Sequence, residues 1–339
     1  MKNPLKKMNK KNRKISLAIS CALIIGFGVS CIMTLESCNK ETVSNGAINN
    51  SSNQKGIAEE FISFNIGDII DRETMDAIYD EVAYFHGYEI AECTLNKELL
   101  QLDEKTYLSY ILQKTRSDVE SLELPLLNQH LGENYISLNE ALSLYNYNPT
   151  ESTILSNYDF NQVVKNNFNL DVITAGTNQL MDILIDALEK SETEEEFYAL
   201  YRNRINELTN EISNPNDFFC VYISAAVCMN SFMTWSWYFY NDCSTKKDRP
   251  SVWQRIKDKA QEITKKLEPY VEADLEGAAW GALVGSGCGA IRGAVAGSAA
   301  GGVGAIPGAV AGAVSGAVNG SFEGAIGGSL IHHHKNHKK

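Results

Sequence analysis

The chain has 339 residues, of which 44% are hydrophobic and 21% charged, so it is long enough to bury one large core or two smaller ones. Its formal charge is −12, and residues 1–37 hold seven bases and one acid, so the remainder is more acidic still. An acidic body argues against nucleic acid as a partner. Residues 246–339, with twelve bases and eight acids, form a mildly basic end suited to anionic lipid headgroups.

The N-terminus has the features of an export signal. Residues 1–14 carry all seven of those bases, and an uncharged, mostly apolar run follows from Ile15 to Leu35. The sequence Leu35-Glu36-Ser37-Cys38 resembles a bacterial lipobox, which implies a signal peptide over residues 1–37 and lipidation of Cys38. Cys31 ends a second candidate lipobox, and an uncleaved membrane anchor is the alternative. The protein is therefore expected in the cell envelope, lipid-anchored to the outer membrane or facing the periplasm, or else secreted.

The polar residues 38–57 predict a disordered tether. Helical signals prevail after it, so we predict an all-α fold with an acidic helical body over residues 58–268. Thr193 and Glu196 have the capping-box spacing ahead of apolar residues three and four apart. Further helices are expected near 72–86, 96–117 and 176–190, and at 251–268 as an amphipathic helix that stops at Pro269.

One segment of the body has two interpretations. Phe218 to Asn241 contains no charge and ends in an aromatic cluster, so its length allows a membrane span with an aromatic belt. Its Ser, Asn and Thr residues instead favour a buried central helix of the body, on which the C-terminal segment could rest. Cys220 and Cys228, eight residues apart in this segment, cannot form a disulfide within a helix.

The most regular feature is a pair of glycine series with fourfold spacing. Residues four apart share a helix face, so each series forms a stripe along which another backbone can approach closely. We therefore predict a helical hairpin over residues 269–330, packed either in lipid or against the body. The glycines predicted to pack the helices are Gly277, Gly281, Gly285, Gly289, Gly293, Gly297 and Gly301, then Gly304, Gly308, Gly312, Gly316, Gly320, Gly324 and Gly328.

Two charges, Arg292 and Glu323, lie within this hairpin and would not be level in a symmetric one. A charged side chain in a dry bilayer has a large free-energy cost unless it is paired or faces a wet interior. This favours a homo-oligomer through the glycine faces, a pore, or a partly soluble state.

The tandem G-x-x-x-G run, opened by Asp274-Leu275-Glu276-Gly277-Ala278-Ala279, resembles glycine-zipper envelope proteins and the glycine-rich segments of membrane-active bacteriocins. The resemblance implies a lipid-anchored envelope protein whose hairpin packs in or against membrane lipid, with bacteriocin-like permeabilisation as a sharper form. The alternative is a structural or interaction lipoprotein whose hairpin stays folded against the body.

No catalytic constellation is found in the sequence, so the chain is not expected to be an enzyme and no cofactor is expected. The H-E-x-x-H, G-x-S-x-G and P-loop patterns are absent, and no C-x-x-C pair predicts a metal site. His86 and His130 are expected to be ordinary surface or bundle residues. Residues 331–339, which include His332, His333, His334 and His337, are expected to form an unstructured basic tail.

Overall fold

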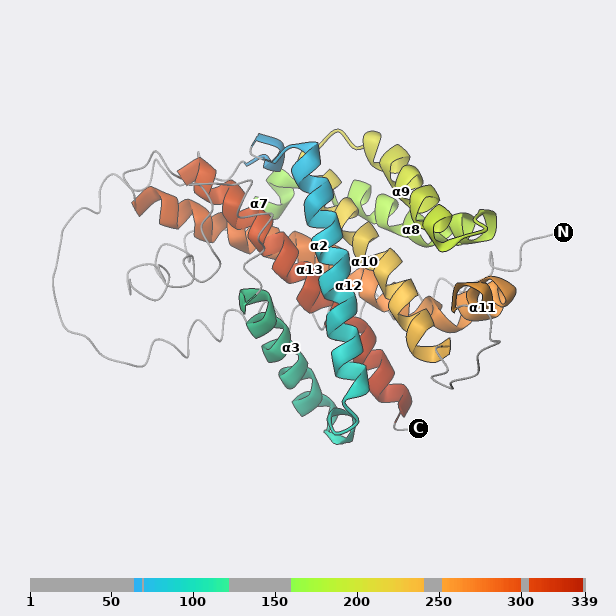
Figure 1. Ribbon diagram of the computed structural model, residues 1–339. Helices are drawn as coiled ribbons and strands as arrows, with labels where there is room; N and C mark the ends of the chain where they lie inside the picture. Colours follow the sequence, from blue (N-terminus) through green and yellow to red (C-terminus); the bar gives the residue numbers. More distant parts are fainter. Residues whose placement is uncertain (1–63, 69, 122–159, 241–251, 300–304, 338–339) are drawn as a thin grey trace. The chain divides into compact units, whose positions relative to one another are not determined.

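The computed structural model describes residues 64–68, 70–121, 160–240, 252–299 and 305–337. All of them belong to one compact unit, Gln54–Lys339, whereas the other unit, Met1–Asn53, lies outside the described residues, as does Cys38. Within the described ranges every regular element is a helix and none is a strand, which confirms the all-α prediction (Figure 1). The predicted signal peptide and the predicted tether, residues 1–57, stay predictions.

The described elements comprise two short 3-10 helices and nine α-helices. In chain order they are η4 (Ile66–Asp68), α2 (Arg72–Leu95), η5 (Leu99–Gln101), α3 (Glu104–Ser121), α7 (Phe160–Asn167), α8 (Leu170–Lys190), α9 (Glu194–Asn210), α10 (Pro215–Tyr240), α11 (Val252–Asp258), α12 (Ala260–Ala299) and α13 (Ala305–His337).

Several helices begin at a capping side chain. Thr193 caps α9, where its hydroxyl accepts a hydrogen bond from the Glu196 backbone N–H at 3.1 Å. Asp71 caps α2 in the same way, accepting from the Thr74 N–H at 2.8 Å. Asn169 caps α8, so this helix starts at Leu170, earlier than the range 176–190 expected from its apolar spacing.

Helix α10 is the central helix of the described fold and packs on α2, α8, α9 and α12. From Phe219 to Cys228 every residue is excluded from solvent. Some of its buried polar side chains bond within the protein, as when Ser224 Oγ donates to the Cys220 carbonyl oxygen at 2.7 Å. Among the described helices α10 alone has the length and hydropathy of a membrane span, and 78% of that stretch is buried in the protein. In this structure it is therefore a core helix of the body.

The prediction that the helix before the hairpin stops at Pro269 is wrong. Helix α12 runs without a break from Ala260 to Ala299 and contains Pro269. Proline removes one backbone donor from a helix, but Leu267 and Val271 on either side are fully buried and Tyr270 packs on Trp235 with ring centroids 4.5 Å apart. This packing holds the helix together across the proline, so the expected boundary between body and hairpin falls inside one helix.

The expectation of an unstructured tail is also wrong for its described part. Helix α13 continues through His337, and the side chains of His333 and His334 are each only 1% exposed. Lys335 forms an ion pair with Glu104 of α3 at 2.8 Å. The end of α13 is helical because it is docked between other helices rather than free in solvent.

Candidate functional site

Helices α12 and α13 lie antiparallel with their glycine backbones in direct contact. A Cβ atom built on Gly285 would come closer than 3.0 Å to the carbonyl oxygen of Gly316, and one on Gly316 would meet the carbonyl of Gly285 in the same way. Real Cβ atoms essentially never approach so closely. The same contact pairs Gly277 with Gly324, Gly281 with Gly320, Gly289 with Gly312 and Gly293 with Gly308. At these positions no residue with a side chain fits without moving a helix.

The close approach belongs to the fourfold series and not to glycine content in general. Gly328 faces the Ala273 carbonyl oxygen, whereas Gly327, which is outside the series, would place a Cβ 3.7 Å from Leu112 and 3.9 Å from Leu108, an ordinary contact with side chains. The surroundings of the three other predicted glycines, Gly297, Gly301 and Gly304, lie outside what the structure describes.

A buried serine adds a polar contact between the two helices. Ser286 of α12 donates a hydrogen bond from Oγ to the Ala313 carbonyl oxygen of α13 at 2.9 Å, and its side chain is fully buried. The Ala313 carbonyl oxygen belongs to the backbone of α13, and in this buried interface the serine hydroxyl is its hydrogen-bond partner in place of water. The bond is possible because the glycine contact brings the two backbones within reach of so short a side chain.

The base of the hairpin is joined to the body by what we call the Asp274 cluster: Asp274, Ser231, Ser329 and His86. Asp274 of α12 is fully buried. It accepts hydrogen bonds from Ser231 Oγ of α10 at 2.5 Å and from the Ser329 backbone N–H of α13 at 3.1 Å. His86 of α2 places Nε2 3.4 Å from Asp274 Oδ2 without completing a hydrogen bond. Four helices therefore meet at one carboxylate.

The Asp274 cluster does not have the arrangement of a catalytic triad. Ser231 donates to the carboxylate and not to the imidazole, whereas a nucleophilic serine needs the imidazole as its base. The side chains of His86, Ser231 and Asp274 are all fully buried, so a substrate has no access to them. The expectation that His86 is an ordinary residue missed this contact, because Asp274 is 188 positions away in the chain. The arrangement is suited to fixing the hairpin on the body.

A second contact between hairpin and body, which we call the C-terminal docking site, holds the last turns of α13. His333 packs among Trp235 at 5.2 Å, Tyr238 at 5.2 Å, Tyr270 at 6.2 Å and Phe239 at 6.4 Å between ring centroids. Its Nε2 atom lies 3.4 Å from the Tyr238 hydroxyl. The site is built by α10 and α12 and leaves His333 almost no exposure to water.

His334, next in the chain, docks on the other side of α13. Its ring stacks on Tyr107 of α3 with centroids 4.4 Å apart, and its Nε2 lies 2.8 Å from the Leu102 carbonyl oxygen, to which it donates.

The buried position of His333 changes its pKa. Burial lowers the pKa of His333 to about 4, and the neighbouring imidazoles of His337 and His332 add to that shift. His333 is therefore neutral at pH 7.

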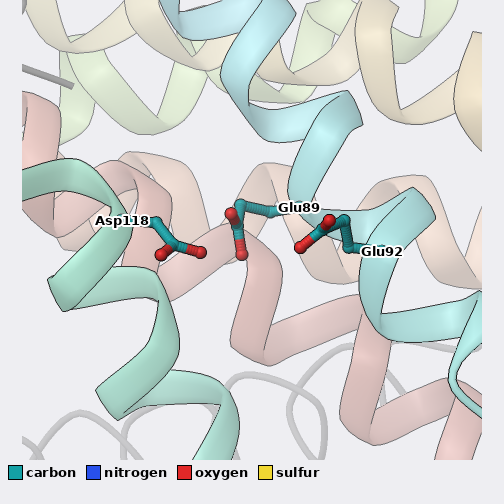
Figure 2. A group of neighbouring side chains, drawn as sticks. All are labelled: Glu89, Glu92 and Asp118. Carbon is teal, nitrogen blue, oxygen red and sulfur yellow. The ribbon is translucent and has the colours of Figure 1, made fainter. Parts of the chain in front are cut away.

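The closest approach to a metal site within the described ranges is a carboxylate cluster of Glu89, Glu92 and Asp118 (Figure 2). One oxygen from each carboxylate lies within 4.8 Å of one oxygen from each of the other two. Lys114 supplies the positive charge for it. Its Nζ lies 3.0 Å from Glu89 and 2.9 Å from Glu92, and it also pairs with Asp118. An ammonium group thus stands among these oxygens, so the cluster is an internal ion-pair network that joins α2 to α3.

Glu89 is the buried member of this carboxylate cluster, with no exposed side-chain surface. Burial raises the pKa of Glu89 to about 7, and a hydrogen bond with Asp118 adds to the rise, while the Lys114 ammonium opposes it. This network was not predicted from the sequence. The acidic side chains of the body are typical of solvated helix faces, and only the packing of α2 beside α3 separates Glu89 from them.

Comparison with protein-family models matches residues 244–323 to a family of unknown function, DUF6861. The match covers α11, α12 and α13 as far as Glu323, which is less than half of the chain. The similarity to that family is therefore confined to the last part of the body and most of the hairpin. Comparison with curated proteins and with solved structures finds no match to this chain.

Proposed function

We propose that this chain is an exported, lipid-anchored envelope protein whose glycine-faced hairpin packs in or against a membrane. The observation that carries the proposal is the backbone contact that runs from Gly277–Gly324 to Gly293–Gly308. Close backbone packing of this kind is the way helices associate in lipid, where apolar side chains gain nothing by leaving the solvent. Bacteriocin-like permeabilisation is the sharper form of this proposal.

The glycine contact lies between α12 and α13, so it does not depend on what surrounds the pair. The outer surface of the hairpin carries apolar residues such as Leu283 and Phe322 that are buried in the described fold. Lipid could cover these residues in place of the body. At 1.5 Å per residue, the helical segment from Gly277 to Ala299 is about 34 Å long, comparable to the roughly 30 Å hydrocarbon core of a bilayer.

Two features limit how deeply the hairpin would insert. Within the described residues, neither α12 nor α13 reaches the mean hydropathy of a membrane span, because glycine and serine dilute their apolar side chains. Gly277 lies opposite Gly324, which places Glu323 at the level of Ala278. Arg292 is 14 positions further along α12, so the two charged positions are not level across the hairpin. Packing against the membrane surface is therefore as much part of the proposal as insertion into it.

The alternative function is a structural or interaction lipoprotein with the hairpin kept on the body. The Asp274 cluster and the C-terminal docking site favour it, because both bind the hairpin to α10 in the described fold. The two functions differ in whether the hairpin ever leaves these contacts.

Lipid labelling with cell fractionation tests the anchoring. The wild-type chain is expected in the envelope fraction with label attached, Cys38→Ala is expected to lose both, and Cys31→Ala is the matched control that keeps them. An unlabelled wild-type chain outside the envelope would overturn the proposal.

Dye release from liposomes containing anionic lipid tests membrane action. The full-length protein at micromolar concentration is expected to release dye, and Gly312→Leu, which disrupts the glycine contact, is expected to release far less. The matched control is Gly327→Ala, which leaves the contact intact. Absence of release by the wild-type protein under all conditions would remove permeabilisation and leave the structural alternative.

A further inference from the structure

The end of α13 is docked through a side chain that can acquire a charge. His333 is the titratable residue of α13 that faces α10 and α12 in the C-terminal docking site, and it is 1% exposed. Four aromatic rings of α10 and α12 pack around it, and the Tyr238 hydroxyl lies 3.4 Å from its Nε2 atom. A site of this kind accepts a neutral imidazole readily and an imidazolium poorly.

The charged and titratable groups that face His333 give no compensation for a positive charge. From α10 the group is the Tyr238 hydroxyl, and from α12 it is Tyr270. Lys266 of α12 is one contact further away, because its ammonium lies 4.2 Å from the centroid of the Phe239 ring, which is itself 6.4 Å from His333. From α13 itself they are His332, His334 and His337. No carboxylate is among the groups that shift the His333 pKa. Protonation would therefore leave a buried cation among aromatic rings with no carboxylate to balance it.

We propose that the C-terminal docking site is a pH-dependent contact, in which protonation of His333 drives the end of α13 out of the aromatic site and frees the hairpin for membrane contact. The inference rests on the proposed function and adds to it the condition under which the hairpin leaves the body. Acidification is the trigger, and the ligand that then replaces the body is anionic lipid.

The sign and size follow from proton linkage. Burial lowers the pKa of His333 to about 4 when the helix is docked, whereas a solvated histidine titrates near its ordinary value of about 6.5. The undocked state binds the proton more tightly, so docking is fully favoured above pH 6.5 and weakens as the pH falls towards 4. The undocking equilibrium is expected to rise about 20-fold from pH 7 to pH 5 and about 100-fold from pH 7 to pH 4.

Hydrogen exchange of the full-length protein measures undocking without reference to activity. Backbone amides of residues 330–337, corrected for the intrinsic effect of pH on exchange, are expected to lose about 20-fold in protection between pH 7 and pH 5. His333→Phe keeps an aromatic ring in the site but cannot be protonated, so its protection should stay constant. His337→Gln keeps His333 but removes the neighbouring imidazole that adds to its pKa shift, so its protection should still fall with pH, by less than that of the wild type.

Dye release from liposomes of phosphatidylcholine and phosphatidylglycerol, measured on the same proteins, separates the two claims. The wild type is expected to release dye increasingly below pH 6, and His333→Phe should not. His333→Arg carries a fixed charge and should release dye already at pH 7, which keeps the test decisive if the phenylalanine variant does not fold.

Equal loss of protection in the wild type and in His333→Phe would overturn the pH-dependent contact while leaving the proposed function standing. Loss of protection that depends on His333, with no dye release at any pH, would uphold the contact and overturn the membrane function.

Discussion

Replacing one glycine of the hairpin interface by alanine should destabilise the protein, although alanine is the better helix former. The position to change is Gly285, where the new Cβ would lie 2.6 Å from the carbonyl carbon of Gly316. The carbonyl oxygen of Gly316 would be closer still. Ordinary contact begins at 3.4 Å, so the two helices would have to separate by more than about 0.8 Å. The facing atoms belong to the backbone and cannot rotate away as a flexible side chain could.

The size of the effect is a difference between two terms. An extra methyl group in a well-packed contact costs about 1–3 kcal/mol, and this backbone contact falls at the upper end because separation also loosens the neighbouring pairs around Gly281 and Gly289. Alanine returns about 1 kcal/mol through its higher helix propensity. The net expectation for Gly285→Ala is a loss of roughly 2 kcal/mol in the free energy of unfolding.

Gly327→Ala is the matched control in the same helix pair. Its Cβ would make ordinary contacts with Leu112 and Leu108, so the propensity gain of up to about 1 kcal/mol should remain. Urea unfolding of the full-length protein, followed by circular dichroism, measures both variants. Opposite signs are expected, and a Gly285→Ala variant as stable as Gly327→Ala would refute the assigned glycine contact.

Three further changes test the contacts of the body. Asp274→Leu leaves the buried donors of Ser231 and Ser329 unpaired and should lower the free energy of unfolding in urea by about 3 kcal/mol, whereas Asp274→Asn, which can still accept, should cost less. Lys114→Met should lower the free energy of unfolding by roughly 2 kcal/mol. Because this change removes the ammonium from among the carboxylates, the melting temperature of the variant should rise with added Ca²⁺, while that of the wild type should not. Burial raises the pKa of Glu89 to about 7, so this group should stabilise the fold at acid pH. That contribution to the free energy of unfolding should be lost as the pH rises from about 4.5 to 7. Glu89→Gln should therefore remove this slope when the free energy of unfolding is measured against pH.

The glycine spacing was sufficient to predict the hairpin because it is a local, repeated signal. A residue every fourth position defines one helix face without reference to the rest of the chain. The polar residues of the uncharged run Phe218 to Asn241, such as Ser224, likewise predicted a buried core helix, which is α10. The Ser224 hydroxyl bonds within that helix. These features needed no knowledge of what packs against them.

The errors arose where distant contacts override local preference. Pro269 is a helix stop by itself, but α12 continues through it because Tyr270 and Val271 pack on the body. The basic composition of residues 331–339 is typical of a solvated end, yet His333 and His334 are held by aromatic residues up to 227 positions away. Such pairings are set by the tertiary fold, and one sequence alone does not reveal them.

The two kinds of contact made by the hairpin have different consequences for function. The contact between Gly285 and Gly316 involves only α12 and α13, so it can persist whether the pair lies on the body or in lipid. The bonds of Asp274 and the packing of His333 exist only while the pair is docked on α10. Any change of state must therefore act on Asp274 or His333 and not on the glycines. Of the two contacts, the C-terminal docking site has no carboxylate among the groups that shift the His333 pKa and could balance the charge of a protonated His333. Release at acid pH should therefore begin at this site.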